Sequence, residues 1–423
     1  MVRAGAAVAP DALVMQFELP GELSKESRDA ARFLAWMSAL FSGGVLVAYL
    51  VTADWSQAIP RDGTSLVVGR DFLNFWMYGR AAITDDPSRF YDAQLYNAEL
   101  RTILGGPYLG QNWSYPPSIM LLAAPFGQLS YISALLIWTA LSFAIFFVVA
   151  QRMLSDRQLL LALLLSPAAV FCLVSGQSSL ITTAMMIGIF AWLDRRPVAT
   201  GLLIGLLSLK PQLGLLFPVL LVASGRWRVF IFAALTVLGI AALTAMLFGP
   251  QVWIDYATKG IATQNIVLLD PRVIAAPFMP TIFMNMRSIG TGYDLAMAVQ
   301  LFFTAAAVVI VFWAFRFRRN ADPLFLMALF FACAVFGSPY LLIYDTLPLT
   351  FAALLLLASG KLDATGIRLA LLVFWLPALQ LAFGSYKIPG PALIAPALAV
   401  YLLFVLKGRE AWLPHRQAAA ANR

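Results

Sequence analysis

Charged residues, cysteine and histidine are all scarce in this sequence. Only 12% of the 423 residues are charged and 61% are hydrophobic, against roughly 45–50% apolar residues in ordinary globular domains. The chain has two cysteines and a single histidine, His415. These residues cannot supply a disulfide framework, a zinc-ligand cluster or a Ser-His or Cys-His catalytic pair. The composition instead predicts a polytopic integral membrane protein.

The net charge of +8 does not indicate a nucleic-acid partner, because Lys and Arg lie mainly at the ends of apolar segments. Basic residues at such places set the orientation of a membrane protein. Residues 1–30 are polar, too long and too acidic before the first apolar run for a cleaved signal peptide. We therefore expect membrane lipids as partners, no nucleic acid, and a first helix that is retained.

Apolar runs long enough to cross a membrane recur along the chain, since a transmembrane helix needs roughly 20 mostly apolar residues. A shorter run, 116–130, opens with two prolines, and the run 198–224 is interrupted by Lys210-Pro211, so the latter is one broken helix or two short ones. The sequence predicts an all-α protein of about twelve transmembrane helices. The other predicted spans lie near 31–51, 131–150, 158–174, 178–193, 228–248, 294–315, 322–336, 341–358, 366–383 and 390–406.

The distribution of basic residues predicts three parts: a cytoplasmic tail at 1–30, a transmembrane domain at 31–406 and a cytoplasmic tail at 407–423. Two loops, 52–115 and 249–293, then lie on the extracytoplasmic side. In the first loop, "DFLNFWMYGRAA" and "YDAQLYNAELRTIL" place aromatic and aliphatic residues at helical spacing. We expect these stretches to form short amphipathic helices on the membrane surface.

Asp71, in "GRDFLNFWMYG", is the first candidate for chemistry. A carboxylate that is partly desolvated under aromatic residues becomes more basic, so it could take a proton from a hydroxyl as a general base. The alternative is structural: Asp71 precedes an apolar helical run and could cap it.

Lys210 is a second candidate, because a lysine in an apolar stretch should face a cavity, a partner or an anion. A phosphate-bearing lipid would suit it. Tyr115, in "NWSYPPSIM", is explained equally by substrate contact and by the aromatic belt of membrane proteins. Gln177, in "SGQSSL", is expected to bind substrate, because a buried amide at a helix junction needs hydrogen-bond partners. Helix capping by Ser175 or Ser178 is the structural alternative.

A third group lies in "FGSPYLLIYDTLPL", which places Tyr340, Tyr344 and Asp345 within about a turn and a half of a helix. The two tyrosines, four residues apart, would share a helix face. Asp345 could hydrogen-bond sugar hydroxyls, or it could pair with Arg287 of "MNMRSIG". We expect Asp71, Tyr115, Tyr340, Asp345 and Arg287 to border one cavity on the extracytoplasmic side.

Four stretches together resemble glycosyltransferase family 87, whose members are polytopic enzymes of the GT-C type. They are "GRDFLNFWMYGRAA", "YPPSIMLLAAPFGQL", "SPYLLIYD" and the long block "GQSSLITTAMMIGIFAWLDRRPVATGLLIGLLSLKPQLGLLFPVLLVASGRWR". The likeness runs from about residue 30 to 405. It implies a mannosyltransferase-like enzyme that uses polyprenyl-phosphate mannose and inverts the sugar configuration.

The resemblance assigns Asp71 to the general base in the first extracytoplasmic loop and Lys210 to the Lys-Pro element of the family. Arg70 and Asn74 are expected to bind substrate beside Asp71. No cofactor is expected; a divalent ion is compatible with the chemistry, but no Asp-X-Asp pair indicates one. One departure is histidine, which some relatives use in a later loop and which this chain has only at His415.

The resulting hypothesis is a glycosyltransferase of the inner membrane. It would transfer a sugar from a polyprenyl-phosphate donor to a lipid or glycan hydroxyl on the periplasmic side, with one base and a cation near the leaving phosphate. The alternative is a flippase or transporter of lipid-linked sugars, because many helices and an intramembrane lysine describe one equally well. A polymerase or ligase of surface polysaccharide would use the same chemistry on a larger acceptor.

Overall fold

The computed structural model describes residues 25–108, 111–154, 156–270 and 275–408, and most of these residues are helical. The helices run in chain order as α1 (Lys25–Val51), α2 (Phe72–Ala82), α3 (Ala93–Leu104), α4 (Ile119–Gly127), α5 (Tyr131–Met153), α6 (Arg157–Leu164), α7 (Pro167–Ser175), α8 (Ser179–Trp192), α9 (Pro197–Leu206), α10 (Pro211–Gly214), α11 (Phe217–Ser224), α12 (Trp227–Phe248), α13 (Gln251–Asp255), α14 (Ile261–Leu269), α15 (Ile282–Ser288), α16 (Tyr293–Phe317), α17 (Pro323–Phe336), α18 (Leu347–Ala358), α19 (Ala364–Ser385) and α20 (Ile394–Gly408).

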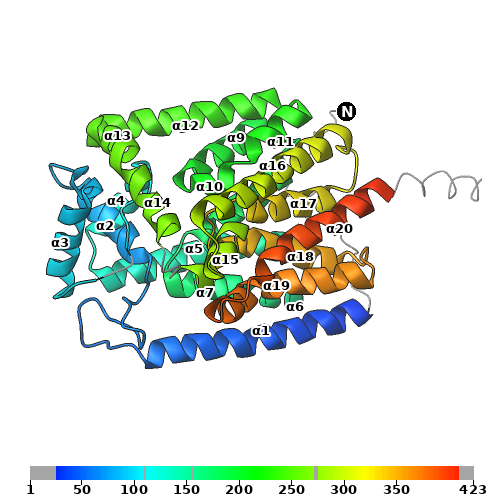
Figure 1. Cartoon of the computed structure of the whole chain (residues 1–423), viewed down its shortest axis with the longest axis horizontal. Coiled ribbons are helices and arrows are strands. Elements are labelled where there is room, and N and C mark those ends of the chain that lie inside the picture. The colour runs from blue at the N-terminus through cyan, green and yellow to red at the C-terminus, as the bar shows by residue number, and fades with distance from the viewer. Residues whose placement is uncertain (1–24, 109–110, 155, 271–274, 409–423) are drawn as a thin grey trace, which may run out of the picture.

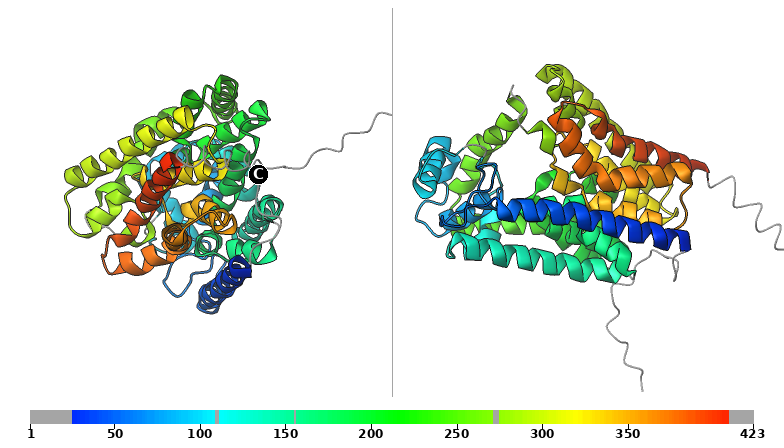
Figure 2. Two further views of the ribbon diagram at one scale, coloured as in Figure 1. Left: turned by 90° about the vertical axis from the view of Figure 1, so that its right-hand side faces the viewer. Right: turned by 90° about the horizontal axis from the view of Figure 1, so that it is seen from below.

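Six helical spans are long and apolar enough to cross a membrane, and the bent pair of α6 and α7, with 42° between them, would make a seventh. The six run roughly along the long axis of the molecule (Figures 1 and 2). Their outward side chains, such as Leu238, Phe302 and Phe404, are exposed hydrocarbon, as in helices that face lipid. The six spans are Arg28–Val51, Tyr131–Met153, Trp227–Phe248, Tyr293–Phe317, Ala364–Ser385 and Gly390–Gly408.

Shorter apolar helices fill the interior of the bundle. Nearly every residue of α17 and α18 is buried, because these helices are apolar on all sides and pack among α16, α19 and α20. Five such helices of 10–17 residues are too short to count as spans by length alone. The total of about twelve transmembrane helices therefore stays a prediction.

The segment between residues 197 and 224 turns back on itself. Its helices α9 and α11 lie on either side of a break at Lys210-Pro211. Asp194 before α9 and Arg226 after α11 form an ion pair with 2.6 Å between Oδ1 and Nη2, so the segment starts and ends on the same side. Of the two arrangements open from the sequence, this is two short helices, with Lys210 at their inner turn.

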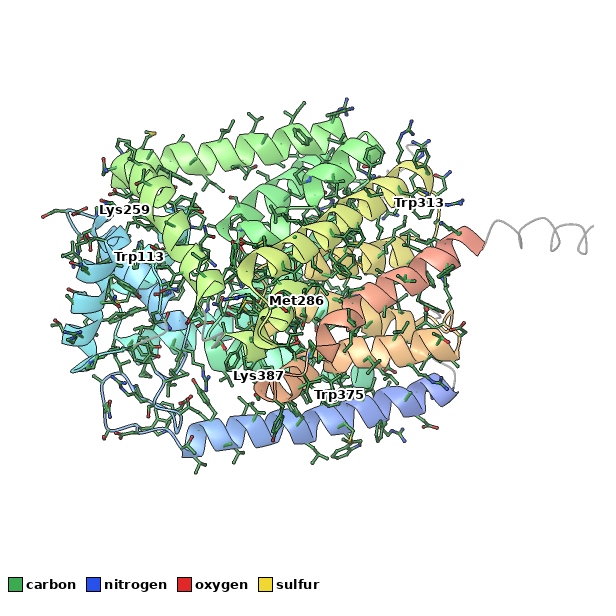
Figure 3. The ribbon with its side chains drawn as sticks, in the orientation of Figure 1. Trp113, Lys259, Met286, Trp313, Trp375 and Lys387 are labelled. Carbon is green, nitrogen blue, oxygen red and sulfur yellow. The ribbon has the colours of Figure 1, made fainter. Side chains whose placement is uncertain are left out.

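Segment 52–108, with α2 and α3, forms a cap at the end of the bundle away from the C-terminal end of α20 (Figure 1). Its interior is aromatic and is completed by Trp113 from the loop before α4: this ring, labelled in Figure 3, stacks on Tyr78 with 3.5 Å between ring centroids and packs against Phe90 and Tyr96. Such pairs add to the stabilisation from burial. The cluster fixes α2 and therefore the residue just before it, Asp71. The position of these helices relative to a membrane stays a prediction.

Candidate active site

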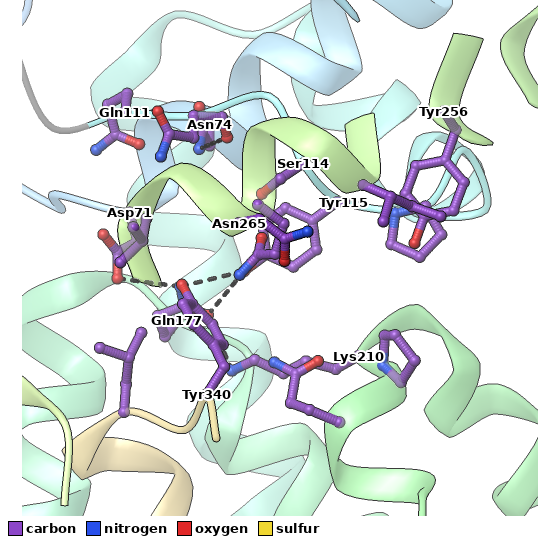
Figure 4. Close-up of a pocket in the computed structure, with 18 of the residues that line it drawn as sticks. Asp71, Asn74, Gln111, Ser114, Tyr115, Gln177, Lys210, Tyr256, Asn265 and Tyr340 are labelled. Atoms are coloured by element: carbon purple, nitrogen blue, oxygen red, sulfur yellow. Dashed lines mark hydrogen bonds between the residues drawn. The ribbon is translucent and has the colours of Figure 1, made fainter. Parts of the chain in front are cut away.

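A cavity of about 360 Å³ lies between the cap and the bundle (Figure 4). Its walls come from the start of α2, the loop before α4, the α7–α8 junction, α10, α14 and the loop before α18. It is lined by Asp71, Asn74, Gln111, Asn112, Ser114, Tyr115, Pro116, Gln177, Lys210, Pro211, Gln212, Leu215, Tyr256, Ile261, Gln264, Asn265, Val267, Tyr340, Leu342 and Tyr344.

A left-handed stretch of backbone places Asp71 at this cavity. Gly69 has φ 84° and Arg70 has φ 38°, a region that glycine adopts freely and arginine rarely does. The Gly69 amide donates to the Tyr49 hydroxyl at 2.5 Å. Gly176 also packs here, where a Cβ would lie 2.5 Å from the Cβ of Phe72. This close approach brings the α7–α8 junction against the start of α2.

The Asp71 side chain does not cap α2, although it occupies the position before the helix. Instead its Oδ2 accepts hydrogen bonds from the Tyr344 hydroxyl at 2.6 Å and from Gln177 Nε2 at 3.1 Å. The capping interpretation is therefore wrong. The carboxylate is half-buried, and none of the described residues donates to its other oxygen, Oδ1.

Lys210 forms a buried ion pair with Asp345, with 2.6 Å between Nζ and Oδ1 and side chains 3% and 0% exposed. Its other hydrogen bonds go to Gln177 Oε1 and Ser179 Oγ, both at 3.3 Å. The expected alternative pairing of Asp345 with Arg287 is wrong, since Lys210 is the partner. Asp345 also accepts from Ser179 Oγ at 2.6 Å and lies behind the cavity wall.

Gln177 joins the two carboxylates into one network, as Figure 4 shows for its bonds to Asp71 and Tyr115. Its Nε2 lies 3.2 Å from the Tyr115 hydroxyl, and its Oε1 accepts from Lys210. Ser178, at the start of α8, makes no side-chain capping bond, so capping there does not account for Gln177.

The tyrosines predicted for the site line the cavity, but not from one helix. Tyr340 lies in a loop, and Tyr344 lies in the 3₁₀ turn Ile343–Thr346, so the expected shared helix face is wrong. Both residues lie in the link between the end of α17 and the start of α18, and both line the cavity. Burial raises the pKa of Tyr115 and of Tyr340, so both phenols stay neutral at physiological pH.

Of three other residues predicted to bind substrate, one lines the cavity and two do not. Asn74 lines the cavity and donates to the Asn112 carbonyl at 2.8 Å. Arg70 does not line it, because its guanidinium pairs with Asp62 at 2.7 Å. Arg287 does not line it either; its Nη1 donates to the Thr291 carbonyl at 3.0 Å. The expected five-residue border thus includes Asp71, Tyr115 and Tyr340, with Asp345 behind the wall and Arg287 elsewhere.

Most of the carboxamides that line the cavity are not among the residues predicted from the sequence. Gln264 and Asn265 are adjacent polar residues within the apolar helix α14, which was the available signal. Carboxamides both donate and accept hydrogen bonds, so they suit a ligand rich in hydroxyl groups. The missed amides are Gln111, Asn112, Gln212, Gln264 and Asn265.

Comparison with known proteins gives one finding: residues 113–344 match glycosyltransferase family 87. No curated protein and no solved structure matches the chain. The matched range covers more than half of the chain and includes Tyr115, Gln177, Lys210 and Tyr344, whereas Asp71 lies before it. With its apolar spans and its amide-lined cavity, the chain is a membrane glycosyltransferase and belongs to glycosyltransferase family 87.

Proposed function

We propose that the protein transfers mannose from a polyprenyl-phosphate donor to a hydroxyl of a lipid or glycan, with inversion and with Asp71 as general base. The observation that carries the proposal is the Asp71 carboxylate. This carboxylate is half-buried at the cavity wall, and its Oδ2 is held by hydrogen bonds from Tyr344 and Gln177. None of the described residues donates a hydrogen bond to its Oδ1.

In this reaction the acceptor oxygen attacks C1 of the donor sugar from the face opposite the phosphate. The new C1–O bond forms as the C1–O bond to phosphate breaks, and that electron pair leaves with the phosphate oxygen. The hydroxyl proton passes to Oδ1 of Asp71. A β-linked donor sugar then gives an α-linked product.

The leaving phosphate needs donors or positive charge. Lys210 is the one cation among the described residues that line the cavity, but Asp345 already compensates its charge. The lining amides Gln212, Gln264 and Asn265 are therefore the better source of direct hydrogen bonds to the phosphate, with the Lys210 ammonium behind them.

An extracytoplasmic site is supported by the distribution of charge along the bundle. The ends of α5, α16 and α20 that lie away from the cap carry Arg152, Arg316 and Lys407 (Figure 1). Basic residues favour the cytoplasmic ends of transmembrane helices. The cavity, at the cap end, would then open to the periplasmic side of the inner membrane.

The test is transfer of radiolabelled mannose from polyprenyl-phosphate mannose in proteoliposomes, with a membrane extract of the source cells as acceptor. Asp71→Asn keeps the shape of the side chain and removes the proton acceptor, so the rate should fall on the order of 10²–10⁴-fold. Donor binding and thermal stability should stay close to wild type. No transfer by the wild-type protein would reject the donor class, and an Asn variant with normal turnover would reject Asp71 as the base.

A further inference from the structure

The Gln177 carboxamide lies between a buried ammonium and a carboxylate. Its Oε1 is 3.3 Å from Lys210 Nζ, and its Nε2 is 3.1 Å from Asp71 Oδ2. The side chain is 8% exposed. Gln177 is thus the only described side chain that hydrogen-bonds both Asp71 and the Lys210–Asp345 pair.

The charges on its two sides fix the orientation of this amide. An ammonium group only donates hydrogen bonds, so the atom facing Lys210 is the amide oxygen. An ionised carboxylate only accepts, so the atom facing Asp71 is the amide nitrogen. Lys210 is itself held by hydrogen bonds to Asp345 and Ser179. The amide that is bonded to Lys210 is therefore also held in one orientation.

We propose that Gln177 is a positioning residue: its carboxamide orients the Asp71 carboxylate and keeps Lys210 from pairing with it. The inference rests on the proposed function of Asp71 as a base. A direct contact with an ammonium would stabilise the ionised carboxylate and weaken it as a proton acceptor. The neutral amide satisfies Oδ2 without that cost, and it leaves Oδ1 for the acceptor hydroxyl.

Other titratable groups also lie around Asp71. Tyr344 donates its hydroxyl to Oδ2, and Tyr115 lies on the Gln177 side. Arg70 is adjacent in the chain, but its guanidinium pairs with Asp62. The Lys210 ammonium lies 5.0 Å from the centre of the Tyr344 ring, so the Gln177 amide and this neutral ring together separate the Lys210–Asp345 pair from Asp71.

Gln177→Glu tests the proposal, because it replaces the amide by a carboxylate of the same shape. Two carboxylates within about 3 Å cannot both be ionised at their usual pH. The acidic limb of the pH profile of kcat should therefore move to higher pH by about one unit or more. The exposed residue Gln94, in the first turn of α3, provides a matched control: Gln94→Glu should leave the profile in place.

Gln177→Leu and Gln177→Asn keep the proposal testable if the glutamate variant does not fold. Both should lower kcat about tenfold, with the KM for polyprenyl-phosphate mannose within about twofold, because orientation is lost and donor contacts are kept. An unmoved pH profile in a folded Gln177→Glu variant would overturn the inference, and so would a rise in KM alone, which would make Gln177 a binding residue. Both results require an active wild-type protein, whereas an inactive wild type would defeat the proposed function itself.

Discussion

Replacing Lys210 by methionine should destabilise the protein strongly. The Asp345 side chain is 0% exposed and would keep one hydroxyl donor, Ser179, and a weak amide bond while losing its cation. Breaking a buried ion pair by removing one partner costs about 3–5 kcal/mol, because an uncompensated charge remains. A lysine bound to a phosphate from solvent would show no such loss in the absence of donor.

The double variant Lys210→Met/Asp345→Leu separates the pair from the simple loss of a side chain. Apolar replacement of both partners of a buried ion pair is often close to neutral. The double variant should therefore recover most of the stability that Lys210→Met loses, whereas additive effects would make it less stable than either single variant.

The measurement is thermal unfolding of the purified protein in detergent, with no donor lipid present. Lys361→Met is the matched control, because Lys361 pairs with Asp322 at 2.7 Å but is 34% exposed. Such a pair contributes about 0–1 kcal/mol, so its loss should hardly change the unfolding midpoint. A Lys210→Met variant as stable as the Lys361 control would refute the reasoning from burial.

Three further predictions concern the groups around the cavity. Gly176→Ala should lower both the unfolding midpoint and the turnover, because the new Cβ would lie 2.5 Å from the Cβ of Phe72 in α2. Gly225→Ala is the control. Gly225 also has a positive φ but has open space around it, so this variant should show only the backbone strain of about 1 kcal/mol. Tyr344→Phe removes a 2.6 Å donor to Asp71 and should lower kcat about tenfold with little change in KM, since a hydrogen bond to a charged group contributes about 1.5–3 kcal/mol. Gln264→Leu should raise the KM for the donor severalfold with kcat retained, as expected for a group that binds substrate and transition state alike. Steady-state transfer assays check the Tyr344 and Gln264 predictions. An unchanged KM would remove Gln264 from the donor site.

The long helices were predictable because length and hydropathy decide them. The run near 131–150 became α5, Tyr131–Met153, and the interruption at Lys210-Pro211 became the turn between α9 and α11. The sequence could not show which apolar helices face lipid and which face protein, since both environments are hydrocarbon. For that reason the sequences of α17 and α18 predict ordinary membrane-spanning helices, although both helices are buried in the bundle.

The candidate site was predictable where polar residues interrupt apolar sequence. Asp71, Gln177, Lys210 and Tyr344 all stood out on that ground, and the fold brings them into one hydrogen-bonded network. The pairing of Lys210 with Asp345 was missed, although both lie in apolar runs and each needs a partner there. The amides of α14 gave a weaker signal, because a neutral amide costs less to bury than a charge.

Burial and partners give the two carboxylates of the network different chemistry. Asp345 is fully buried and bound to Lys210, so accepting a proton would leave that ammonium without its counter-charge. Asp71 is half-buried and hydrogen-bonded only to neutral groups among the described residues, so a proton on Oδ1 would leave no cation unpaired. For this reason the proposed reaction assigns the hydroxyl proton to Asp71 and not to Asp345. In the proposed function this difference gives the buried carboxylate a purpose: Asp345 holds the lysine that would otherwise pair with the proposed base, Asp71.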